Sequence, residues 1–430
     1  MIYFIKKALK KILPANLLAF YHYLWALFSA CFYGFPGQSK DFIIIGVTGT
    51  SGKSTTVDFI TRILEEDGKR VASFSSVRFK IGKEEWENKY KMTMPGRWVV
   101  QNFLKKARRA DCRYVVIEVT SEGVKQFRHK FIKFDALVFT NLSPEHIESH
   151  GGFENYREAK LKLFRENPQA VHIINVADEN AEFFWRLPAR KKIGFKLKNQ
   201  KLKCPLNNYP LIEAEPLNLI NLEFEIGGQK FVLAAMGQFN IMNALASVAV
   251  AFNYGIKLEI CSQALAKAKS IPGRMEVLIR EPFMVVVDYA HTPQQLESVY
   301  QSLTSFLSEG KMICVLGSCG GGRDKWKRPV LGEIASRYCE KAIITNEDPY
   351  DEDPLEIINQ VAQGAGEKAE RILDRRQAIK RALALAQKGD VVVITGKGAE
   401  PWMCVANGKK IPWDDREIVK EELKEKKIKI

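Results

Sequence analysis

Ten consecutive residues, GVTGTSGKST at positions 46–55, place three glycines beside a lysine and several hydroxyl side chains. Glycines let a backbone turn its N–H groups inward around a phosphate, and the positive end of a helix dipole adds to the attraction. In such a loop Lys53 reaches the β- and γ-phosphates of a nucleotide, and the hydroxyl of Ser54 or Thr55 holds Mg²⁺. The sequence therefore predicts a phosphate-binding loop (P-loop). Val47, however, stands where the common G-x-x-x-x-G-K-[ST] pattern has its first glycine.

The elements around this loop follow the order that it needs. An apolar strand, DFIIIGVTG, enters the loop, and a helix, KSTTVDFITRILEEDG, leaves it. Further apolar strands alternate with helices, which is typical of a mostly parallel, doubly wound sheet. Residues 195–235 are richer in strands, and a second strand–helix alternation follows. We predict an α/β fold with a hydrophobic, basic segment (1–40), a central P-loop domain (41–271) and a C-terminal Rossmann-like domain (272–430).

The composition narrows the classes of partner. The 430 residues include 65 Lys and Arg against 50 Asp and Glu, which gives a net charge of +15. This balance fits a solvated basic surface, an anionic substrate or an anionic membrane surface. No stretch interleaves aromatic residues and arginines as an RNA-binding motif does, so we expect no nucleic acid partner. The eight scattered cysteines form no C-x-x-C pair, which favours a reducing cytosol over a zinc ribbon or a disulfide framework.

The N-terminus combines lysines with apolar residues. MIYFIKKALKKIL carries four lysines among Ile and Leu residues, as a basic amphipathic helix does. After Pro14, the run LLAFYHYLWALFSACFYGF has about the length of a bilayer span but is interrupted by Tyr21, His22 and Tyr23. We interpret residues 1–36 as a helix that binds a membrane surface, a lipid carrier or a partner. Packing on the body of the protein comes second, and a true span third.

A resemblance explains the unusual spacing of the loop. GVTGTSGKST is similar to the G-x-T-G-T-x-G-K-[ST]-T loop of the Mur ligases, the ATP-dependent amide-forming enzymes of peptidoglycan synthesis. Other motifs of that family follow in the same order over about residues 41–420. The resemblance implies that ATP is bound by the loop residues Gly49, Thr50, Ser51, Gly52, Lys53, Ser54 and Thr55.

The same resemblance implies two Mg²⁺ ions and a modified lysine. EVTSEG at 118–123 resembles the family's E-V-S-S-x-x-L, in which the glutamate, here Glu118, holds Mg²⁺ directly or through water. FTNLSPEHIESHGGFENYREAK at 139–160 resembles F-T-N-L-x-x-D-H-L-D-x-H-G…Y-x-x-A-K. This match makes His146 a ligand of the second metal ion and Lys160 a carbamylated lysine that supports it. The implied metal-binding set is Ser54, Glu118, His146 and Lys160, and the implied catalytic set is Lys53, Glu118, His146 and Lys160.

Three further matches concern the nucleotide. GQFNIMNALAS resembles the family's G-x-x-N-x-x-N-x-x-A, which implies that Asn240 contacts or shapes the adenine pocket and that Asn243 is structural. PGRME places Arg274 where the family contacts phosphate or ribose, and DYAHTP places Asp288 and His291 near the nucleotide.

The C-terminal motifs resemble one branch of the family, the MurE type, which adds the third residue of the stem peptide. GSCGGGRDKWKRPVLGEIA resembles its G-x-x-G-x-R-D-x-x-K-R-P, and WDDREIV resembles its D-D-R-E. The resemblance implies that Arg323 binds the carboxylate of the incoming amino acid through a bidentate pair. The residues that it assigns to substrate binding are Thr93, Thr120, Ser121, Arg128, Arg323, Asp348, Gly396 and Glu400.

The sequence also departs from the MurE pattern. About forty residues precede the P-loop, too few for the family's N-terminal domain that binds the uridine nucleotide. EDPY at 347–350 replaces D-N-P-R, so Tyr350 stands where an arginine clamps the distal carboxylate of diaminopimelate. Ala399 replaces the histidine of G-K-G-H-E. The identity of the amino acid, and the choice between a UDP-linked and a lipid-linked acceptor, therefore stay open.

The resemblance implies an ATP-dependent peptide ligase that adds an amino acid to a muramyl-peptide acceptor through an acyl phosphate. We expect a cytoplasmic monomer, peripheral to the inner face of the membrane if residues 1–36 bind there. One alternative is a poly-γ-glutamate or folylpolyglutamate type of Mur ligase, against which GRDKWKRP and DDRE argue. The other is a membrane-associated regulatory P-loop ATPase.

Overall fold

The computed structural model describes residues 14–90, 92–206, 208–268, 270–307, 309–426 and 428. The predicted basic helix of residues 1–13 lies outside the described residues. The chain divides into two compact units. The first contains the chain up to Ser143 with 154–234 and 239–268; the second contains 144–153, 235–238 and 269–430.

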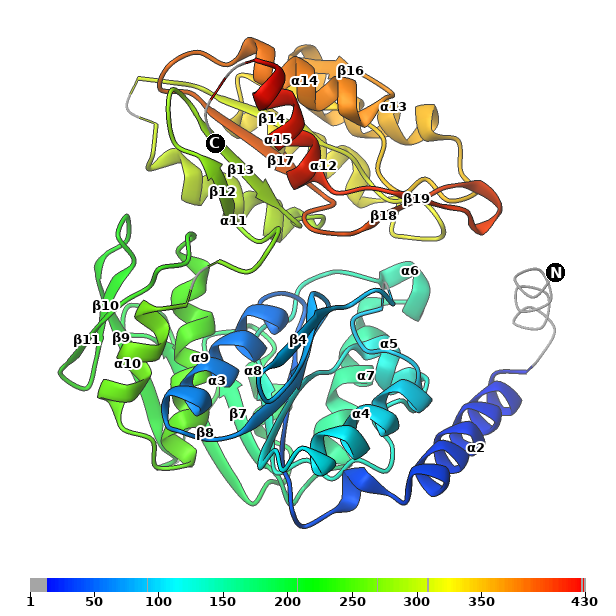
Figure 1. Cartoon of the computed structure of the whole chain (residues 1–430), viewed down its shortest axis with the longest axis vertical. Coiled ribbons are helices and arrows are strands. Elements are labelled where there is room, and N and C mark those ends of the chain that lie inside the picture. The colour runs from blue at the N-terminus through cyan, green and yellow to red at the C-terminus, as the bar shows by residue number, and fades with distance from the viewer. Residues whose placement is uncertain are drawn as a thin grey trace. The chain divides into compact units, whose positions relative to one another are not determined.

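The first unit is built on a mostly parallel sheet (Figure 1). Among the described residues it has eleven strands in the order β11-β10-β9-β8-β7-β6-β1-β5-β2-β3-β4, and only the pairs at its two ends are antiparallel. The strands are β1 Ile43–Thr48, β2 Val71–Phe74, β3 Arg78–Ile81, β4 Glu84–Glu87, β5 Tyr114–Glu118, β6 Ala136–Phe139, β7 Val171–Asn175, β8 Lys191–Leu197, β9 Leu211–Asn218, β10 Glu223–Ile226 and β11 Gln229–Val232.

Helices cover both faces of this sheet, as right-handed crossovers between parallel strands require. Helix α3, which follows β1, packs against α9 and α10, whereas α4 and α7 lie on the opposite face (Figure 1). The helices are α2 Ala15–Tyr33, η1 Pro36–Gln38, α3 Lys53–Glu66, α4 Arg97–Arg109, α5 Ser121–Lys125, α7 Phe153–Arg165, α8 Ala181–Trp185, α9 Phe239–Asn253 and α10 Leu258–Ala266. In the described part of the chain, no helix has both the length and the apolar character needed to cross a membrane.

The central strand β1 explains the position of the first glycine of GVTGTSGKST. Gly46 lies within β1, and a Cβ atom built on it would lie 2.8 Å from side-chain atoms of Phe134 and Leu137. Gly46 therefore allows close packing of the strand on its neighbours and is not part of the loop. The loop begins after Thr48, and its first glycine is Gly49.

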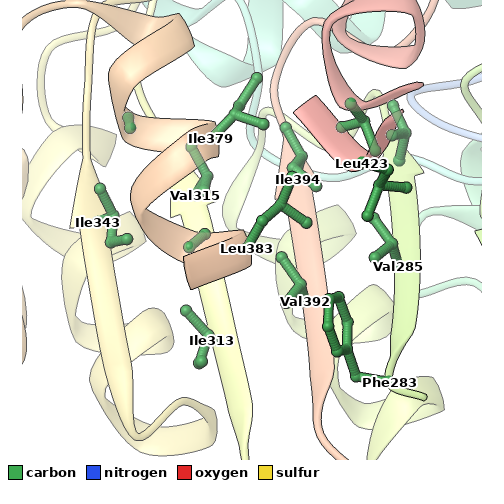
Figure 2. Close-up of a cluster of buried hydrophobic side chains, with 14 of the residues drawn as sticks. Phe283, Val285, Ile313, Val315, Ile343, Ile379, Leu383, Val392, Ile394 and Leu423 are labelled. Carbon is green, nitrogen blue, oxygen red and sulfur yellow. The ribbon is translucent and has the colours of Figure 1, made fainter. Parts of the chain in front are cut away.

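The second unit has a six-stranded sheet in the order β12-β13-β17-β14-β15-β16, parallel except for β12, and a separate hairpin, β18–β19. In Figure 2, Ile379 and Leu383 of α14 lie against strand residues such as Val315 and Ile394, and all belong to one buried cluster. The strands are β12 Glu276–Ile279, β13 Met284–Asp288, β14 Met312–Leu316, β15 Lys341–Ile344, β16 Ala369–Arg371, β17 Val391–Thr395, β18 Trp402–Cys404 and β19 Lys410–Pro412. The helices are α6 Ile147–His150, α11 Pro293–Thr304, α12 Lys327–Tyr338, α13 Pro354–Ala365, η2 Gly366–Lys368, α14 Arg375–Leu385, η3 Ala406–Gly408 and α15 Asp415–Glu425.

These two sheets confirm the predicted α/β class. The expected strands before and after the P-loop are β1, β2, β5 and β6, and the second alternation is β13, β14, β15 and β17. Strand β7, the hairpins β3–β4 and β18–β19 and the edge strands β12 and β16 were not predicted; apart from β7, they are short and lack long apolar runs. The chain segments 144–153 and 235–238 belong to the second unit, although the chain on both sides of each belongs to the first.

Candidate active site

The predicted P-loop joins β1 to α3 at the carboxyl end of the parallel strands. Gly49 and Gly52 have φ values of +153° and +79°, a region that side chains with a Cβ rarely adopt. A Cβ on Gly49 would overlap Thr140 Oγ1, and one on Gly52 would overlap the amide of Asn243. Helix α3 begins at Lys53 with no side-chain cap, so its first-turn N–H groups face the loop opening, as an anion site requires.

Three predicted residues meet directly behind this loop. Ser54 Oγ donates a hydrogen bond to Glu118 Oε2 at 2.7 Å, and Ser76 N donates to the same oxygen at 2.9 Å. Lys53 Nζ lies 3.8 Å from Glu118 Oε1 and donates to Thr50 O at 2.8 Å. They meet because Glu118 ends β5 beside Val47 of β1, which directly precedes the loop.

This arrangement fits Mg²⁺ and a triphosphate. A serine hydroxyl and a carboxylate are hard oxygen ligands of the kind that Mg²⁺ takes, usually together with substrate phosphates and water. A lysine at the position of Lys53 is the cation that P-loops place at the phosphates. Across the described residues there is no group of three or more His, Cys, Asp and Glu side chains able to hold a metal ion, so protein ligands alone build no closed cage.

Lys160 lies at the P-loop and not at the surface. Its side chain is 1 % exposed, and Nζ donates to Gly49 O at 2.7 Å. Tyr156, one helical turn earlier on α7, is 3.0 Å from Thr50 Oγ1 through its hydroxyl. The Y-x-x-A-K spacing places Tyr156 and Lys160 four residues apart on one face of the helix. Tyr156 contacts the side chain of Thr50, and Lys160 contacts the backbone of Gly49.

Helix α9 places two asparagines of its first turns, Asn240 and Asn243, next to the P-loop. Asn243 lies against Gly52, and its Nδ2 donates to Asn240 Oδ1 at 2.8 Å. Both side chains are buried. Asn243 thus has the packing contact that a structural residue needs, and it holds Asn240 next to the loop.

The residues predicted to bind the acceptor come together around Met94. Arg128 donates to the carbonyl of Met94, and a Cβ on Gly123 would lie 2.6 Å from the Met94 sulfur. Thr93 directly precedes Met94, and Thr120 caps α5 by accepting from Gly123 N at 3.0 Å. Ser121 is buried in the first turn of α5. Burial lowers the pKa of Arg128 below its usual value, because loss of water disfavours its charged form.

In the second unit, Glu145 contacts two of the predicted residues, His291 and His146. Its Oε1 lies 3.0 Å from His291 Nε2 and 3.5 Å from His146 Nε2. Arg323 Nη1 lies 3.4 Å from His146 Nδ1. The described structure therefore places His146 with Glu145, His291 and Arg323 in the second unit, while Glu118 belongs to the first.

Asp288 and Arg274 shape a neighbouring turn of the second unit. Asp288 accepts hydrogen bonds from Met275 N (2.7 Å) and Ala290 N (2.6 Å), and its burial raises its pKa. The guanidinium of Arg274 lies over the Tyr289 ring at 4.2 Å. The two carboxylate oxygens of Asp288 thus hold the backbone just after Arg274 and just before His291.

A third group surrounds the EDPY segment. Lys397, fully buried, donates to Asp348 Oδ1 at 3.0 Å and to Glu400 Oε2 at 2.6 Å. Glu347 Oε1 accepts from Cys319 Sγ at 3.0 Å, and its Oε2 would overlap any Cβ at Gly396, so that position requires glycine. Lys397 follows β17, which lies between β13 and β14 in the middle of the six-stranded sheet (Figure 1).

Sequence reasoning missed several residues that join the predicted ones: Asn141, Glu145, Tyr289, Glu347 and Lys397. Asn141, for example, accepts from Ser51 N through Oδ1 at 2.9 Å. The available signal was their place inside the motifs FTNL, PEH, DYAH, EDPY and GKGAE. A motif match names the residues of interest but does not reveal which acid pairs with which base.

Comparisons with known proteins identify the class. The Mur ligase middle domain model matches residues 47–251, and the model "Mur ligase, glutamate ligase domain" matches residues 273–398. A UDP-N-acetylmuramoyl-L-alanyl-D-glutamate--2,6-diaminopimelate ligase of Syntrophomonas wolfei is 36% identical over 418 residues, which cover 93% of this chain and 82% of that protein. A UDP-N-acetylmuramyl-tripeptide synthetase of a Roseiflexus species is 36% identical over 414 residues, or 90% and 79% of the two chains.

A solved structure gives the same result. A UDP-N-acetylmuramoyl-L-alanyl-D-glutamate--2,6-diaminopimelate ligase matches with a TM-score of 0.58 and 28% identity, covering 90% of this chain and 79% of that chain. The chain therefore belongs to the Mur ligase family, as an ATP-dependent ligase of the MurE type.

Proposed function

We propose that this enzyme joins an amino acid to a muramyl-peptide acceptor in the synthesis of a peptidoglycan precursor, using ATP. The observation that supports this most strongly is that Ser54 and Lys53, at the end of the P-loop, both lie close to Glu118. A carboxylate oxygen is a poor leaving group, so the acceptor carboxylate must first be phosphorylated before an amine can displace it. Such a transfer needs mainly positioning and neutralisation of charge.

The residues of the first unit divide this work between them. Lys53 would stabilise the negative charge on the phosphoryl group during transfer, and the N–H groups at the start of α3 would hold its oxygens. Ser54 and Glu118 would hold Mg²⁺, which supplies further charge neutralisation when bound. Asn240 would border the adenine, with Arg274, Asp288 and His291 of the second unit as further nucleotide-binding residues.

We also propose that Lys160 is carbamylated in the active enzyme, and that His146 assists a second Mg²⁺. The ammonium of Lys160 would first lose one proton. The neutral amine would then attack CO₂, forming an N–C bond and losing a second proton, which leaves a carbamate anion. Its nitrogen keeps one hydrogen, enough to retain the observed bond to Gly49 O. The carbamate thereby converts a buried cation at the loop into an anion able to support a metal ion.

The amino acid is most simply a diamino acid. Relatives with 33–36% identity are named as ligases of 2,6-diaminopimelate, which makes this compound the first candidate. Arg323 would bind the α-carboxylate, with Asp348, Gly396 and Glu400 lining the same site. Tyr350, whose burial raises its pKa, offers no cation to a second carboxylate. Thr93, Thr120, Ser121 and Arg128 would contact the acceptor, and the reaction would take place in the cytoplasm, where ATP is supplied.

ATP hydrolysis with and without substrates tests this proposal. We expect turnover only when a muramyl dipeptide and an amino acid are both present, with a panel of diaminopimelate, L-lysine and neutral amino acids as the amine. Lys53→Ala should lose about 10²–10³-fold in turnover, by analogy with the loss of one oxyanion donor. Lys69→Ala, an exposed lysine just beyond the same helix, is the matched control. Acceptor-independent hydrolysis, or near-normal turnover of Lys53→Ala, would contradict the proposal.

A further inference from the structure

Helix α2 exposes an apolar face to the solvent. The helix has nineteen residues and contains no Asp, Glu, Lys or Arg. Its outward face carries Leu17, Phe20, Tyr21, Phe28 and Phe32, of which Phe28 and Phe32 are 63% and 68% exposed. A surface helix normally shows charged residues on this side. An exposed aromatic surface of this kind marks a site of interaction.

The opposite face of α2 is firmly attached to the first unit. Ala26, Ser29 and Ala30 are buried there. Trp98 of α4 contacts the rings of Trp25 and Tyr33 with centroid distances of 6.2 and 5.9 Å, and it also lies 5.3 Å from the mostly exposed ring of Phe32. Helix α2 lies beside α4 (Figure 1), and these contacts fix the orientation of its outward face.

The surroundings of α2 are strongly basic. The segments 14–40, 92–110 and 123–134 contain ten Lys and Arg residues and no Asp or Glu. Acidic residues of neighbouring segments pair with some of them, Asp41 with Arg108 at 3.0 Å and Glu166 with Lys130 at 3.1 Å. Residues 1–13, which precede α2 and lie outside the described residues, add four lysines by sequence. The basic residues of the three segments are Lys40, Arg97, Lys105, Lys106, Arg108, Arg109, Lys125, Arg128, Lys130 and Lys133.

We propose that the outward face of α2 docks on the surface of an anionic phospholipid membrane, with the helix lying in the plane of the headgroups. Phe and Tyr side chains enter the boundary between headgroups and acyl chains, and exposed neighbouring cations such as Lys106 and Arg109 bind lipid phosphates. A second copy of this chain fits the outward face of α2 less well, because a symmetric contact through α2 would bring two basic surfaces together and they would repel each other. A flat anionic bilayer complements both the aromatic face and its charge.

Co-sedimentation of the full-length protein with vesicles tests the proposal. We expect binding to vesicles of phosphatidylcholine with phosphatidylglycerol, weakening with added salt, and little binding to phosphatidylcholine alone. The double variant Phe28→Ser/Phe32→Ser should bind about a hundredfold more weakly, since each buried phenyl ring contributes at least about tenfold. Phe252→Ser, which removes a half-exposed phenyl ring from α9 of the same unit, is the matched control and should bind as the wild type does.

A charge variant and two physical measurements make the result decisive. Lys106→Glu/Arg109→Glu should also weaken binding to the anionic vesicles while leaving Phe28 and Phe32 in place. Both sites are exposed, so unchanged circular dichroism and melting temperature are expected for either double variant. Wild-type protein that does not sediment with the anionic vesicles would overturn the proposal. So would a wild-type dimer that both double variants convert to a monomer, which would assign the face to a second copy.

Discussion

Replacing Glu118 by glutamine separates the charge of this side chain from its shape. Glutamine has the size of glutamate, and its amide oxygen can still accept from Ser54 and Ser76, which both donate to Oε2. The substitution removes the negative charge 3.8 Å from Lys53 Nζ. We therefore expect a folded protein with a changed requirement for Mg²⁺.

The substitution should strengthen the binding of ATP in the absence of Mg²⁺ and raise the concentration of Mg²⁺ needed for turnover. Two unit charges 3.8 Å apart interact by about 4 kcal/mol at an effective dielectric constant of 20. Because Lys53 is partly exposed, water screens this interaction, and we expect its net contribution to be about 1–2 kcal/mol. Without Mg²⁺, the variant should bind ATP roughly tenfold more tightly, because Lys53 no longer neutralises a nearby carboxylate and the triphosphate no longer faces one. With Mg²⁺, the concentration needed for half-maximal turnover should rise at least about tenfold, and maximal turnover should fall about 10²–10³-fold.

Calorimetric titration of ATP with EDTA and with Mg²⁺, together with turnover across a Mg²⁺ series, measures both effects. Glu84→Gln, the same charge change on the exposed strand β4, should behave as the wild type does. If Glu118→Gln keeps the wild-type requirement for Mg²⁺, Glu118 is not a metal ligand. If the variant melts much earlier and loses ATP under both conditions, the residue is structural, and the reasoning fails.

Substitutions at three more residues test other parts of the site and of the fold. Lys160→Ala should lose most ligase activity, and Lys160→Arg should do no better, since a guanidinium cannot form a carbamate. Lys162→Ala on the same helix serves as the control. Full activity of the arginine variant would exclude the carbamate. Asp415→Asn should lower the free energy of unfolding by about 3–5 kcal/mol in urea titrations, because it leaves the fully buried Arg375 without its bidentate partner at 2.7–2.8 Å; a loss below about 1 kcal/mol would contradict this. Tyr350→Arg should raise the ratio of kcat/KM for diaminopimelate over L-lysine by about ten- to a hundredfold through a charge-assisted pair with the second carboxylate; an unchanged ratio would place Tyr350 outside the amino-acid site.

Local patterns in the sequence determined the elements and the phosphate loop. Gly49, Gly52 and Lys53 are consecutive parts of one turn, so their spacing alone specifies the backbone conformation and the start of the helix. The buried strands β1, β5 and β6 are continuous apolar runs, which identifies them without any knowledge of their neighbours. Family resemblance added the residues of the site, and most of them indeed lie at the carboxyl ends of strands or in the loops beyond them.

Only the tertiary structure decided which of these side chains meet and which face of each element is covered. Gly46 has the appearance of a loop glycine, but its place in β1 against Phe134 and Leu137 makes it a packing residue. Lys397 is an unremarked lysine in the sequence and becomes the buried partner of two acids in the fold. The outward face of α2 cannot be told from its buried face by composition, because both are apolar. Pairing and burial depend on neighbours that are distant in the chain, and a sequence pattern records only the neighbours that are near.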